Sequence, residues 1–459
     1  MSTTPWPLFY TLPSCPTITT QDRFGLLDAD TPSVPFWSVL SALLTPPVGS
    51  LPAFLEILEI IAVELRGTAP PDYNTLRSCL QAREAELLNT IWPKVKELAL
   101  DMPRLFPMHR LPVLKDGGAG KVELSREQVG CLVAHQLLST LAAPLWQDGF
   151  QNFEIWYQGE QPHVSAPEIY ITAVLDYFAQ IATAVKRPEW TVTYELSSQS
   201  EPFDHGMLQD RMKELGDIEL RPMSEKTSES ESLGTSGNAV VISANRFIGF
   251  GRSATQEEVF VGTTPEACPG VLVTPPLTDS QVLVVRGCEA VVKTVGQGRQ
   301  IRMCGTHTKP HDEIGEEHRN KWRDRTMLFM DALELDSYDG AAYPDVEHAN
   351  VEREMAKALR AFGSANYPRI YTGLWGCRTF GGDPEVKMTI LWLAATVKES
   401  ALVITYEEER EDFAQKLARF VDLVRARGYK VGDVWDLLWE AEGSGIAKWG
   451  FLDWVFGRR

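Results

Sequence analysis

The sequence is short of basic residues, histidines and cysteines. Lysine and arginine number 44 against 62 aspartates and glutamates, which gives a formal net charge of −18, and there are only 8 histidines in 459 residues. A protein that coats nucleic acid non-specifically needs a basic face to neutralise phosphates, so the acidity argues against that class. It does not exclude a small anionic ligand, because a few backbone N–H groups at a helix N-terminus can hold one.

Cysteine pairs and long apolar runs are also lacking. No two of the 7 cysteines form a Cys-x-x-Cys pair, and their number is odd, which indicates reduced thiols and no zinc ribbon. The first ten residues lack the basic start and apolar run of a signal peptide. Charged residues interrupt the two most apolar stretches, Leu51–Leu65 and Met388–Tyr406, so we expect no membrane span. We therefore expect a protein of the nucleus and/or cytoplasm.

The composition is that of a globular protein with a large core: 44% of the residues are hydrophobic and 23% are charged. Prolines are dense near the start, so residues 1–35 are expected to be extended. Residues 36–188 are expected to form a helical accessory domain. In residues 189–459, short β-branched runs alternate with helical stretches, which predicts an α/β domain with a mixed sheet flanked by helices. Polar residues dominate near 224–238, where we expect a mobile loop.

Individual elements can be placed from their local patterns. Ser125 and Gln128 have the spacing of a capping box before an apolar run, which predicts a helix start. The other expected helices cover Pro52–Leu65, Leu80–Leu98, Val351–Phe362, Pro384–Val397 and Asp412–Arg427, the last ending before Gly428. The expected strands cover Trp190–Leu196, Ala239–Ser243, Gln281–Arg286, Met327–Leu333 and Leu402–Tyr406.

Two glycine-containing segments could bind a ligand through their backbone. Gly249-Phe250-Gly251 follows the strand Ala239–Ser243, and glycines there either let the backbone approach a ligand or form a plain tight turn. Gly381 and Gly382 precede Asp383-Pro384, a suitable N-cap and first helical residue. Free N–H groups at that helix start could hold a phosphate. The alternative is a plain loop leading into a capped helix.

Glu257 and Glu258 are adjacent carboxylates, a pair that could supply acid–base chemistry. A carboxylic acid that stays protonated near neutral pH can protonate a glycosidic leaving oxygen. The alternative, which the residues alone favour, is two solvated glutamates on a surface turn. His307, His311 and His318 lie among acidic residues as a metal site would, but Pro310 breaks their helical spacing. We therefore expect a polar loop there, and no metal or cofactor.

Taken together, these segments resemble the poly(ADP-ribose) glycohydrolase family. That family has a glycine-rich loop followed within a few residues by Gln-Glu-Glu, here Gly249–Gly251 and then Gln256–Glu258. The stretch Trp375-Gly376-Cys377, followed by Phe380-Gly381-Gly382-Asp383, is similar to the second ligand loop of the family. Weaker similarity extends the resemblance over roughly residues 105–440.

The resemblance implies a macrodomain preceded by a helical accessory domain. It also implies an enzyme that hydrolyses the ribose–ribose O-glycosidic bond of poly(ADP-ribose) and releases ADP-ribose, without a metal. Glu258 would then be the general acid/base, and Glu257 would hold ribose hydroxyls of the unit that is removed. Asn245 would help to fix the distal ribose, and Gly249 and Gly251 would hold the diphosphate, with the 376–382 loop on its other side. The substrate-binding residues would be Asn245, Gly249, Phe250, Gly251, Gln256, Gly376, Cys377, Phe380, Gly381, Gly382 and Gln297.

Several positions depart from the family pattern and indicate a divergent member of fungal type. Phe250 stands where the family usually has a glycine, and Ile242 and Leu374 replace polar residues. Thr294 and Gln297 stand where animal members carry two tyrosines on the adenosine side. The alternative function is a reader that binds ADP-ribose but hydrolyses the polymer poorly, because Phe250 crowds the Gly249–Gly251 loop that would hold the diphosphate. The expected partners are poly(ADP-ribose) and ADP-ribosylated proteins. We expect a monomer, with neither direct DNA binding nor membrane association.

Overall fold

The computed structural model describes residues 6–27, 33–67, 72–116, 120–146, 149–184, 189–198, 212–223, 230–296, 298–307, 316–336 and 343–458. The chain groups into two compact units, each built from separate stretches. The first unit comprises Met1–Tyr194, Phe247–Pro276 and Gly287–Arg319. The second comprises Glu195–Arg246, Leu277–Arg286 and Asn320–Arg459. Because both units contain residues that follow position 188, no single position in the sequence divides one unit from the other.

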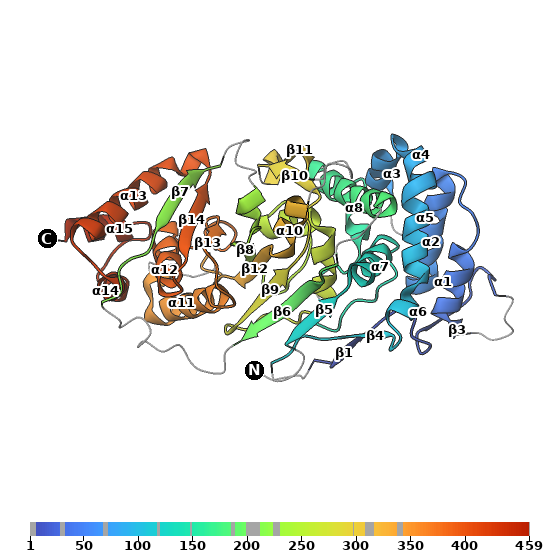
Figure 1. The fold of residues 1–459 in the computed structure, drawn as a ribbon, viewed down its shortest axis with the longest axis horizontal. Coiled ribbons are helices and arrows are strands. Elements are labelled where there is room, and N and C mark those ends of the chain that lie inside the picture. The colour runs from blue at the N-terminus through green and yellow to red at the C-terminus, as the bar shows by residue number, and fades with distance from the viewer. Residues whose placement is uncertain are drawn as a thin grey trace. The chain divides into compact units, whose positions relative to one another are not determined.

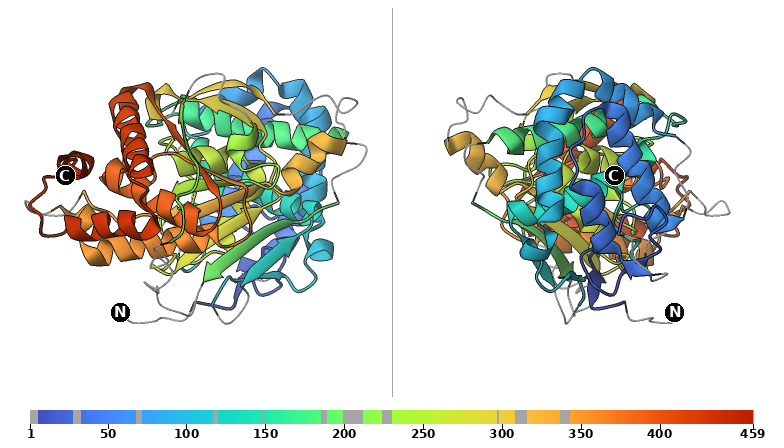
Figure 2. Two further views of the ribbon diagram at one scale, coloured as in Figure 1. Left: turned by 60° about the vertical axis from the view of Figure 1, so that its left-hand side comes forward. Right: turned by 90° about the vertical axis from the view of Figure 1, so that its right-hand side faces the viewer.

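The first unit is mainly helical. Helices α1 and α2 pack together, α1 also contacts α5, and α5 contacts α7, as Figures 1 and 2 show. Its helices are α1 (Phe36–Leu44), α2 (Leu51–Arg66), α3 (Asn74–Gln81), α4 (Glu84–Glu86), α5 (Trp92–Leu100), α6 (Met102–Leu105), α7 (Arg126–Leu137), α8 (Ser165–Thr183) and α9 (Gln256–Gly262). Its strands are β1 (Phe9–Thr11), β2 (Thr19–Thr20), β3 (Val34–Pro35), β4 (Arg110–Pro112), β5 (Lys121–Leu124), β10 (Val292–Val295) and β11 (Arg302–Thr306). The predominance of helix before residue 188 agrees with the sequence pattern.

The single helix expected over Leu80–Leu98 is wrong, because the chain divides this stretch. Helix α3 ends at Gln81, and a π-helical turn over Leu87–Ile91 precedes α5. Pro93 occupies the first turn of α5 and has no backbone N–H, so it cannot bond to the carbonyl four residues earlier. The apolar periodicity continues through the interruption, since Leu87, Ile91 and Val95 are all buried.

The start of α7 confirms the capping box expected at Ser125. The Ser125 hydroxyl accepts from the backbone N–H of Gln128, and the Gln128 side chain accepts from the backbone N–H of Ser125. This helix is buried almost all round, including His135 and Gln136, which are fully inaccessible. It is therefore a core helix of the first unit.

The second unit is built on strands of a mixed sheet in the order β6-β9-β12-β8-β13-β14-β7, of which β6 begins in the stretch assigned to the first unit. Strand β8 pairs in parallel with both β12 and β13, whereas β9 runs antiparallel to β12. The strands are β6 (Val192–Ser198), β7 (Ile218–Pro222), β8 (Ala239–Ala244), β9 (Gln281–Arg286), β12 (Thr326–Asp331), β13 (Arg369–Thr372) and β14 (Ala401–Tyr406). The five expected strands, which correspond to β6, β8, β9, β12 and β14, are confirmed to within two residues at each end. The carboxyl end of β8 leads directly into Asn245.

Helices of the second unit pack on this sheet and on one another. Figure 1 shows α11 and α12 side by side, and both helices contribute to one large apolar core. The helices are α10 (Glu316–Arg323), which begins in the stretch assigned to the first unit, α11 (His348–Phe362), α12 (Pro384–Val397), α13 (Glu411–Ala426), α14 (Val431–Ala441) and α15 (Phe451–Gly457). The expected helix Pro384–Val397 is confirmed at both ends. Gly428 has a φ of 66° just after α13, as a C′ glycine should.

The polar segment near 224–238 is described only from residue 230 onward. There it forms a short 3-10 helix, Ser230–Leu233, and then a turn in which Thr235 and Asn238 are buried. All seven cysteines are free thiols. None of the helices in the described part of the chain is long and apolar enough to cross a membrane.

Candidate active site

The Gln256-Glu-Glu258 segment forms the first turn of α9, in the first unit. Thr255 is the N-cap, with a backbone φ of −64° and ψ of 165°. Its hydroxyl accepts from the backbone N–H of Glu258 at 3.4 Å, and a carboxylate oxygen of Glu258 accepts from the backbone N–H of Thr255 at 3.2 Å. The two glutamates therefore lie at a capped helix start, and the expected surface turn is wrong. The Thr-x-x-Glu spacing was a sequence signal for this cap.

Both carboxylates are bound to the glycine loop that precedes the helix. Oε1 of Glu257 accepts from the backbone N–H of Gly249 at 3.1 Å, and Glu257 is only 7% exposed. Oε2 of Glu258 accepts from the backbone N–H of Ser253 at 2.7 Å. The loop and the carboxylate pair thus form one hydrogen-bonded element, in which neither glutamate is a freely rotating surface side chain.

The geometry of the loop depends on Gly251 and Ala254, both of which precede the N-cap residue Thr255. A β-carbon at Gly251 would stand only 2.6 Å from Cδ of Glu258, so only glycine fits there while Glu258 keeps its position. Ala254 has a φ of 55°, in the left-handed region that residues with a side chain rarely adopt. Surrounding contacts stabilise this strained backbone conformation. One of them is the hydrogen bond from the N–H of Gly298 to the carbonyl of Ala254, at 3.0 Å.

An aromatic cluster from the helical region holds the glycine loop. Phe250 is 4% exposed, and its ring packs against Phe153 and Trp156 with centroid distances of 5.5 and 5.3 Å. The indole N–H of Trp156 donates to the carbonyl of Gly251 at 2.7 Å. The ring of Phe250 is therefore part of the core of the first unit, where it anchors the loop and does not cover it.

Tyr170 of α8 adds a buried phenol beside this cluster. Its ring lies 5.2 Å from that of Trp156 and fills the space next to Gly262 of α9. Its hydroxyl is buried and has no hydrogen-bond partner among the described residues. Burial, and then the nearby charge of Glu258, raise the pKa of Tyr170 well above its ordinary value. The side chain is thus a neutral phenol at physiological pH.

The other expected ligand residues lie in the second unit. Asn245 is exposed and comes directly after β8, at the carboxyl end of a parallel strand, where α/β sheets bind ligands. The stretch Gly376–Gly382 joins β13 to α12. Gly376 and Gly381 have φ values of 72° and 66°, so both positions require glycine.

The loop 376–382 is tightly built on its own unit. The backbone N–H of Gly382 donates to the carbonyl of Gly376 at 2.9 Å, and the carbonyl of Phe380 accepts from the N–H of Leu335 at 2.8 Å. Asp383 caps α12 by accepting from the N–H of Glu385 at 2.7 Å, which confirms the expected N-cap. The Tyr343 hydroxyl also donates to Asp383. Burial raises the pKa of Asp383 to about 6.

A buried ion pair lies beneath this loop. The side chain of Lys387 is 1% exposed, and its Nζ lies 2.5 Å from Oε1 of Glu354. The same glutamate oxygen accepts from the N–H of Leu333 at 2.8 Å. A β-carbon at Gly382 would stand 2.7 Å from Cε of Lys387, so the glycine lets the backbone lie directly on the lysine side chain. The aliphatic part of the lysine side chain therefore packs against the loop, while its ammonium group binds Glu354.

The expected ligand residues differ in whether their side chains are exposed enough to contact a ligand. Cys377 is 4% exposed and its thiol donates to the carbonyl of Trp375, so only its backbone is available to a ligand. Phe380 is half-buried against the core of the second unit. Thr294 lies in β10, while Gln297 lies outside the described residues.

The histidines do not form a ligand set where the structure describes them. His307 is buried, His311 lies outside the described residues, and of His318 only the backbone, in α10, is described. Among the described residues, no group of three or more His, Cys, Asp or Glu side chains could hold a metal ion.

The first unit thus brings together Gly249, Phe250, Gly251, Gln256, Glu257 and Glu258, and the second contains Asn245 and the loop 376–382. The sequence did not point to Phe153, Trp156 and Tyr170, which precede the loop by about a hundred residues or fewer and read as ordinary core aromatics. Chemically, a capped carboxylate beside a rigid glycine loop can exchange a proton with a ligand that the loop's backbone holds.

Comparison with known proteins identifies the family. The helical-domain model of poly(ADP-ribose) glycohydrolase (PARG) matches residues 79–196, and the PARG model described as a Macro domain fold matches residues 209–413. Poly(ADP-ribose) glycohydrolase 1 of Arabidopsis thaliana is 23% identical over 464 residues, covering 80% of each chain. Poly(ADP-ribose) glycohydrolase 1 of Caenorhabditis elegans is 24% identical over 287 residues, covering 59% of this chain and 35% of its own.

A solved structure is similar as well. The crystal structure of poly(ADP-ribose) glycohydrolase from Deinococcus radiodurans, in complex with ADP-ribose, covers 47% of this chain and 87% of its own, at 18% identity and a TM-score of 0.29. Because that superposition is partial, the assignment rests on the two family models, which together match most of the chain in the family's order. The chain belongs to the poly(ADP-ribose) glycohydrolase family, with a helical domain followed by a macrodomain-type fold.

Proposed function

We propose that this protein is a glycosidase that hydrolyses the ribose–ribose bonds of poly(ADP-ribose) and releases ADP-ribose, with Glu258 as general acid/base. Membership of the family supports the reaction. The observation that carries the residue assignment is the carboxylate pair at the start of α9, bonded to the Gly249–Gly251 loop. A ligand bound by the backbone of that loop would have both carboxylates beside it.

The proposed chemistry uses one carboxyl group twice. Glu258 protonates the departing ribose oxygen while positive charge develops at the anomeric carbon, and its carboxylate then deprotonates the attacking water. The bonds from Ser253 and Thr255 to Oε2 fix this side chain, so little reorganisation is needed during the reaction. Glu257 is assigned to the ribose hydroxyls, as the resemblance implies.

The ligand contacts in the second unit are proposed from the same resemblance. Asn245 is assigned to the distal ribose and the loop 376–382 to the diphosphate. The proposed partners are poly(ADP-ribose) and ADP-ribosylated proteins, and the proposed compartments are the nucleus and cytoplasm. We assign the chain a monomeric state without direct DNA or membrane binding.

The reader function rested on Phe250 crowding the diphosphate loop. Phe250 is instead buried against Phe153 and Trp156, so crowding by its ring is no longer a reason to favour the reader. Incubation with labelled poly(ADP-ribose), followed by chromatography of the products, tests the proposal. Release of ADP-ribose supports the enzyme. Retention of the intact polymer without release would support the reader, and neither binding nor release would contradict both.

A further inference from the structure

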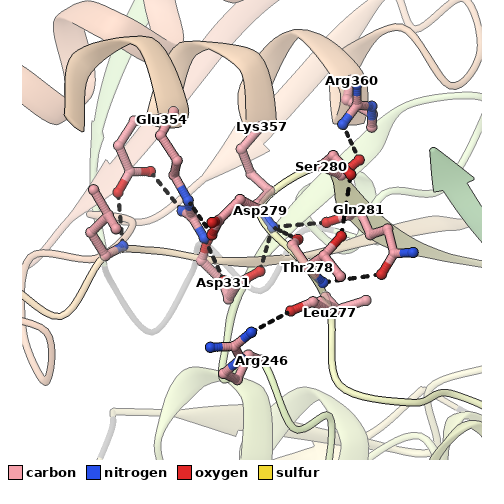
Figure 3. Close-up of polar contacts among 12 residues, drawn as sticks. Arg246, Leu277, Thr278, Asp279, Ser280, Gln281, Asp331, Glu354, Lys357 and Arg360 are labelled. Carbon is pink, nitrogen blue, oxygen red and sulfur yellow. Dashed lines mark hydrogen bonds and ion pairs between the residues drawn. The ribbon is translucent and has the colours of Figure 1, made fainter. Parts of the chain in front are cut away.

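Lys357 of α11 is a fully buried lysine whose ammonium group faces the ends of other elements. Its Nζ donates to the carbonyls of Thr278 and Gln281, each at 2.8 Å, and lies 2.5 Å from Oδ1 of Asp331. Figure 3 shows the side chain reaching from the helix into the turn before β9 and toward Asp331, the last residue of β12. One cation thus joins three segments of the second unit.

The turn that Lys357 holds is bonded to the residue next to Asn245. The N–H of Leu277 donates to the carbonyl of Arg246 at 2.8 Å, and the Arg246 guanidinium donates back to the carbonyl of Leu277 at 3.4 Å (Figure 3). On the other side of Asn245, Ala244 pairs in register with Asp331. Both chain neighbours of Asn245 are therefore connected to Lys357, one through the turn and one through the strand pair.

The carboxylate of Asp331 does not need Lys357 for charge compensation. Arg353 already binds Oδ2 of Asp331 at 2.5 Å and its backbone carbonyl at 2.8 Å. Burying a second cation is costly, and a buried charge persists where it is paired and fully hydrogen-bonded. Arg353 also bonds the exposed Asp279 side chain, and Arg360 donates to the Ser280 carbonyl, so the turn has other contacts with α11. What Lys357 adds is a hold on the backbone at both ends of the turn, through the carbonyls of Thr278 and Gln281.

We propose that Lys357 is a positioning residue that sets the place of Asn245 for the substrate, by fixing the Leu277–Gln281 turn to Arg246 and the end of β12. This inference rests on the proposed function through the role assigned to Asn245. Lys357 itself is buried and acts through its neighbours.

The charge state of Lys357 gives the inference a second consequence. Burial lowers the pKa of Lys357 to about 8, while the carboxylate of Asp331 raises it and the guanidinium of Arg353 lowers it again. The charged groups that face it are Asp331 from β12, Arg353 from α11 and, more distantly, Asp279 from the turn. Above pH 8 the amine loses one donor and its charge, so the hold on the turn weakens as pH rises.

Lys357→Met tests the inference, because the Asp331–Arg353 pair remains and no carboxylate is left alone. Hydrogen–deuterium exchange should become about tenfold faster in residues 277–281, the cost expected when hydrogen bonds from a charged donor are lost. Titration with ADP-ribose should show binding weakened by about tenfold. Lys213→Met is the matched control: it removes a lysine bond to a carbonyl of the same unit, that of Val397, and should change neither readout.

Lys357→Arg, which stays protonated, covers the case in which the methionine variant does not fold. Between pH 7 and 9.5 the wild type should lose ADP-ribose affinity, and residues 277–281 should lose protection after correction for the intrinsic exchange rate. The arginine variant should lose neither. Unchanged exchange in the methionine variant, or identical pH profiles for wild type and arginine variant, would overturn the inference. If the wild type bound no ADP-ribose, the proposed function would fail, and exchange in residues 277–281 would still decide the positioning role.

Discussion

The carboxyl group of Glu258 occupies the space that a β-carbon would need at Gly251. Its Cδ lies 2.6 Å from the ideal β-carbon position, well inside van der Waals contact. The indole N–H of Trp156 fixes the same glycine by donating to its carbonyl at 2.7 Å. A backbone position in the loop and the rotamer of the proposed catalytic acid therefore determine each other.

Gly251→Ala should reduce turnover by about 100-fold or more, because the added methyl group must displace Glu258 or the loop, and misplacement of a reacting group by about 1 Å costs this much. Gly49→Ala is the control, since a β-carbon at Gly49 meets nothing within 4 Å. Release of ADP-ribose from labelled polymer is the measurement. An alanine variant at 251 with wild-type activity would show that Glu258 can act from another position.

Trp156→Phe should weaken catalysis while leaving the aromatic packing with Phe153 and Phe250 largely in place. The substitution removes the N–H that holds the Gly251 carbonyl, a contribution of about 1 kcal/mol. We expect a several-fold loss in kcat/KM. Trp190→Phe removes an equivalent bond, from the indole to the carbonyl of Gly287, and should leave kcat/KM unchanged. Equal losses in the two variants would indicate a general effect on stability rather than a role in the loop.

Two buried tyrosines give opposite expectations for stability. The Tyr170 hydroxyl is buried without a hydrogen-bond partner among the described residues, so Tyr170→Phe should leave stability unchanged or raise it by up to about 1 kcal/mol. The Tyr157 hydroxyl donates to the carbonyl of Leu137 at 2.7 Å, so Tyr157→Phe should lower stability by about 1 kcal/mol. Urea unfolding of both variants measures the difference. A destabilised Tyr170→Phe would show that the phenol has a partner in solution.

The parts that could be predicted from the sequence are those encoded locally. The N-cap Asp383 followed by Pro384 placed α12 correctly, and Ser125 with Gln128 placed the start of α7. The segments Gly249–Gly251 and Gln256–Glu258 could be recognised because each consists of residues that are consecutive in the sequence. Local patterns also misled, because the apolar periodicity over Leu80–Leu98 continues across the turn at residues 82–83 and the π-helical turn over Leu87–Ile91.

The supports of the candidate site could not be predicted, because they join segments far apart in the chain. The bond from Trp156 to Gly251 spans 95 residues, and that from Lys357 to Thr278 spans 79. Neither tryptophan nor lysine carries a local signal that distinguishes this role from ordinary core packing or an exposed helix face. Only the tertiary fold specifies these partners.

Acid should destabilise the first unit through His135. Burial lowers the pKa of His135 to about 4 from 6.5, so between these values the folded state binds fewer protons than the unfolded chain. The stabilising contribution is complete above pH 6.5 and is lost as the pH falls toward 4, by up to about 3 kcal/mol. Urea unfolding of the wild type and His135→Gln across this range measures it. The variant should show a shallower pH dependence, and parallel curves would contradict the assignment.

Glu258→Gln tests the central claim most directly, because it removes the proton-transfer group and little else. The glutamine amide oxygen can still accept from the N–H groups of Ser253 and Thr255, and Gln serves this capping position as Glu does. Release of ADP-ribose from labelled poly(ADP-ribose) should fall by about 10²- to 10⁴-fold, while ADP-ribose binding stays near that of the wild type. Glu123→Gln, at an exposed ion pair with Lys121, should keep full activity. Near-wild-type release by Glu258→Gln would contradict the assignment of Glu258 as the general acid/base.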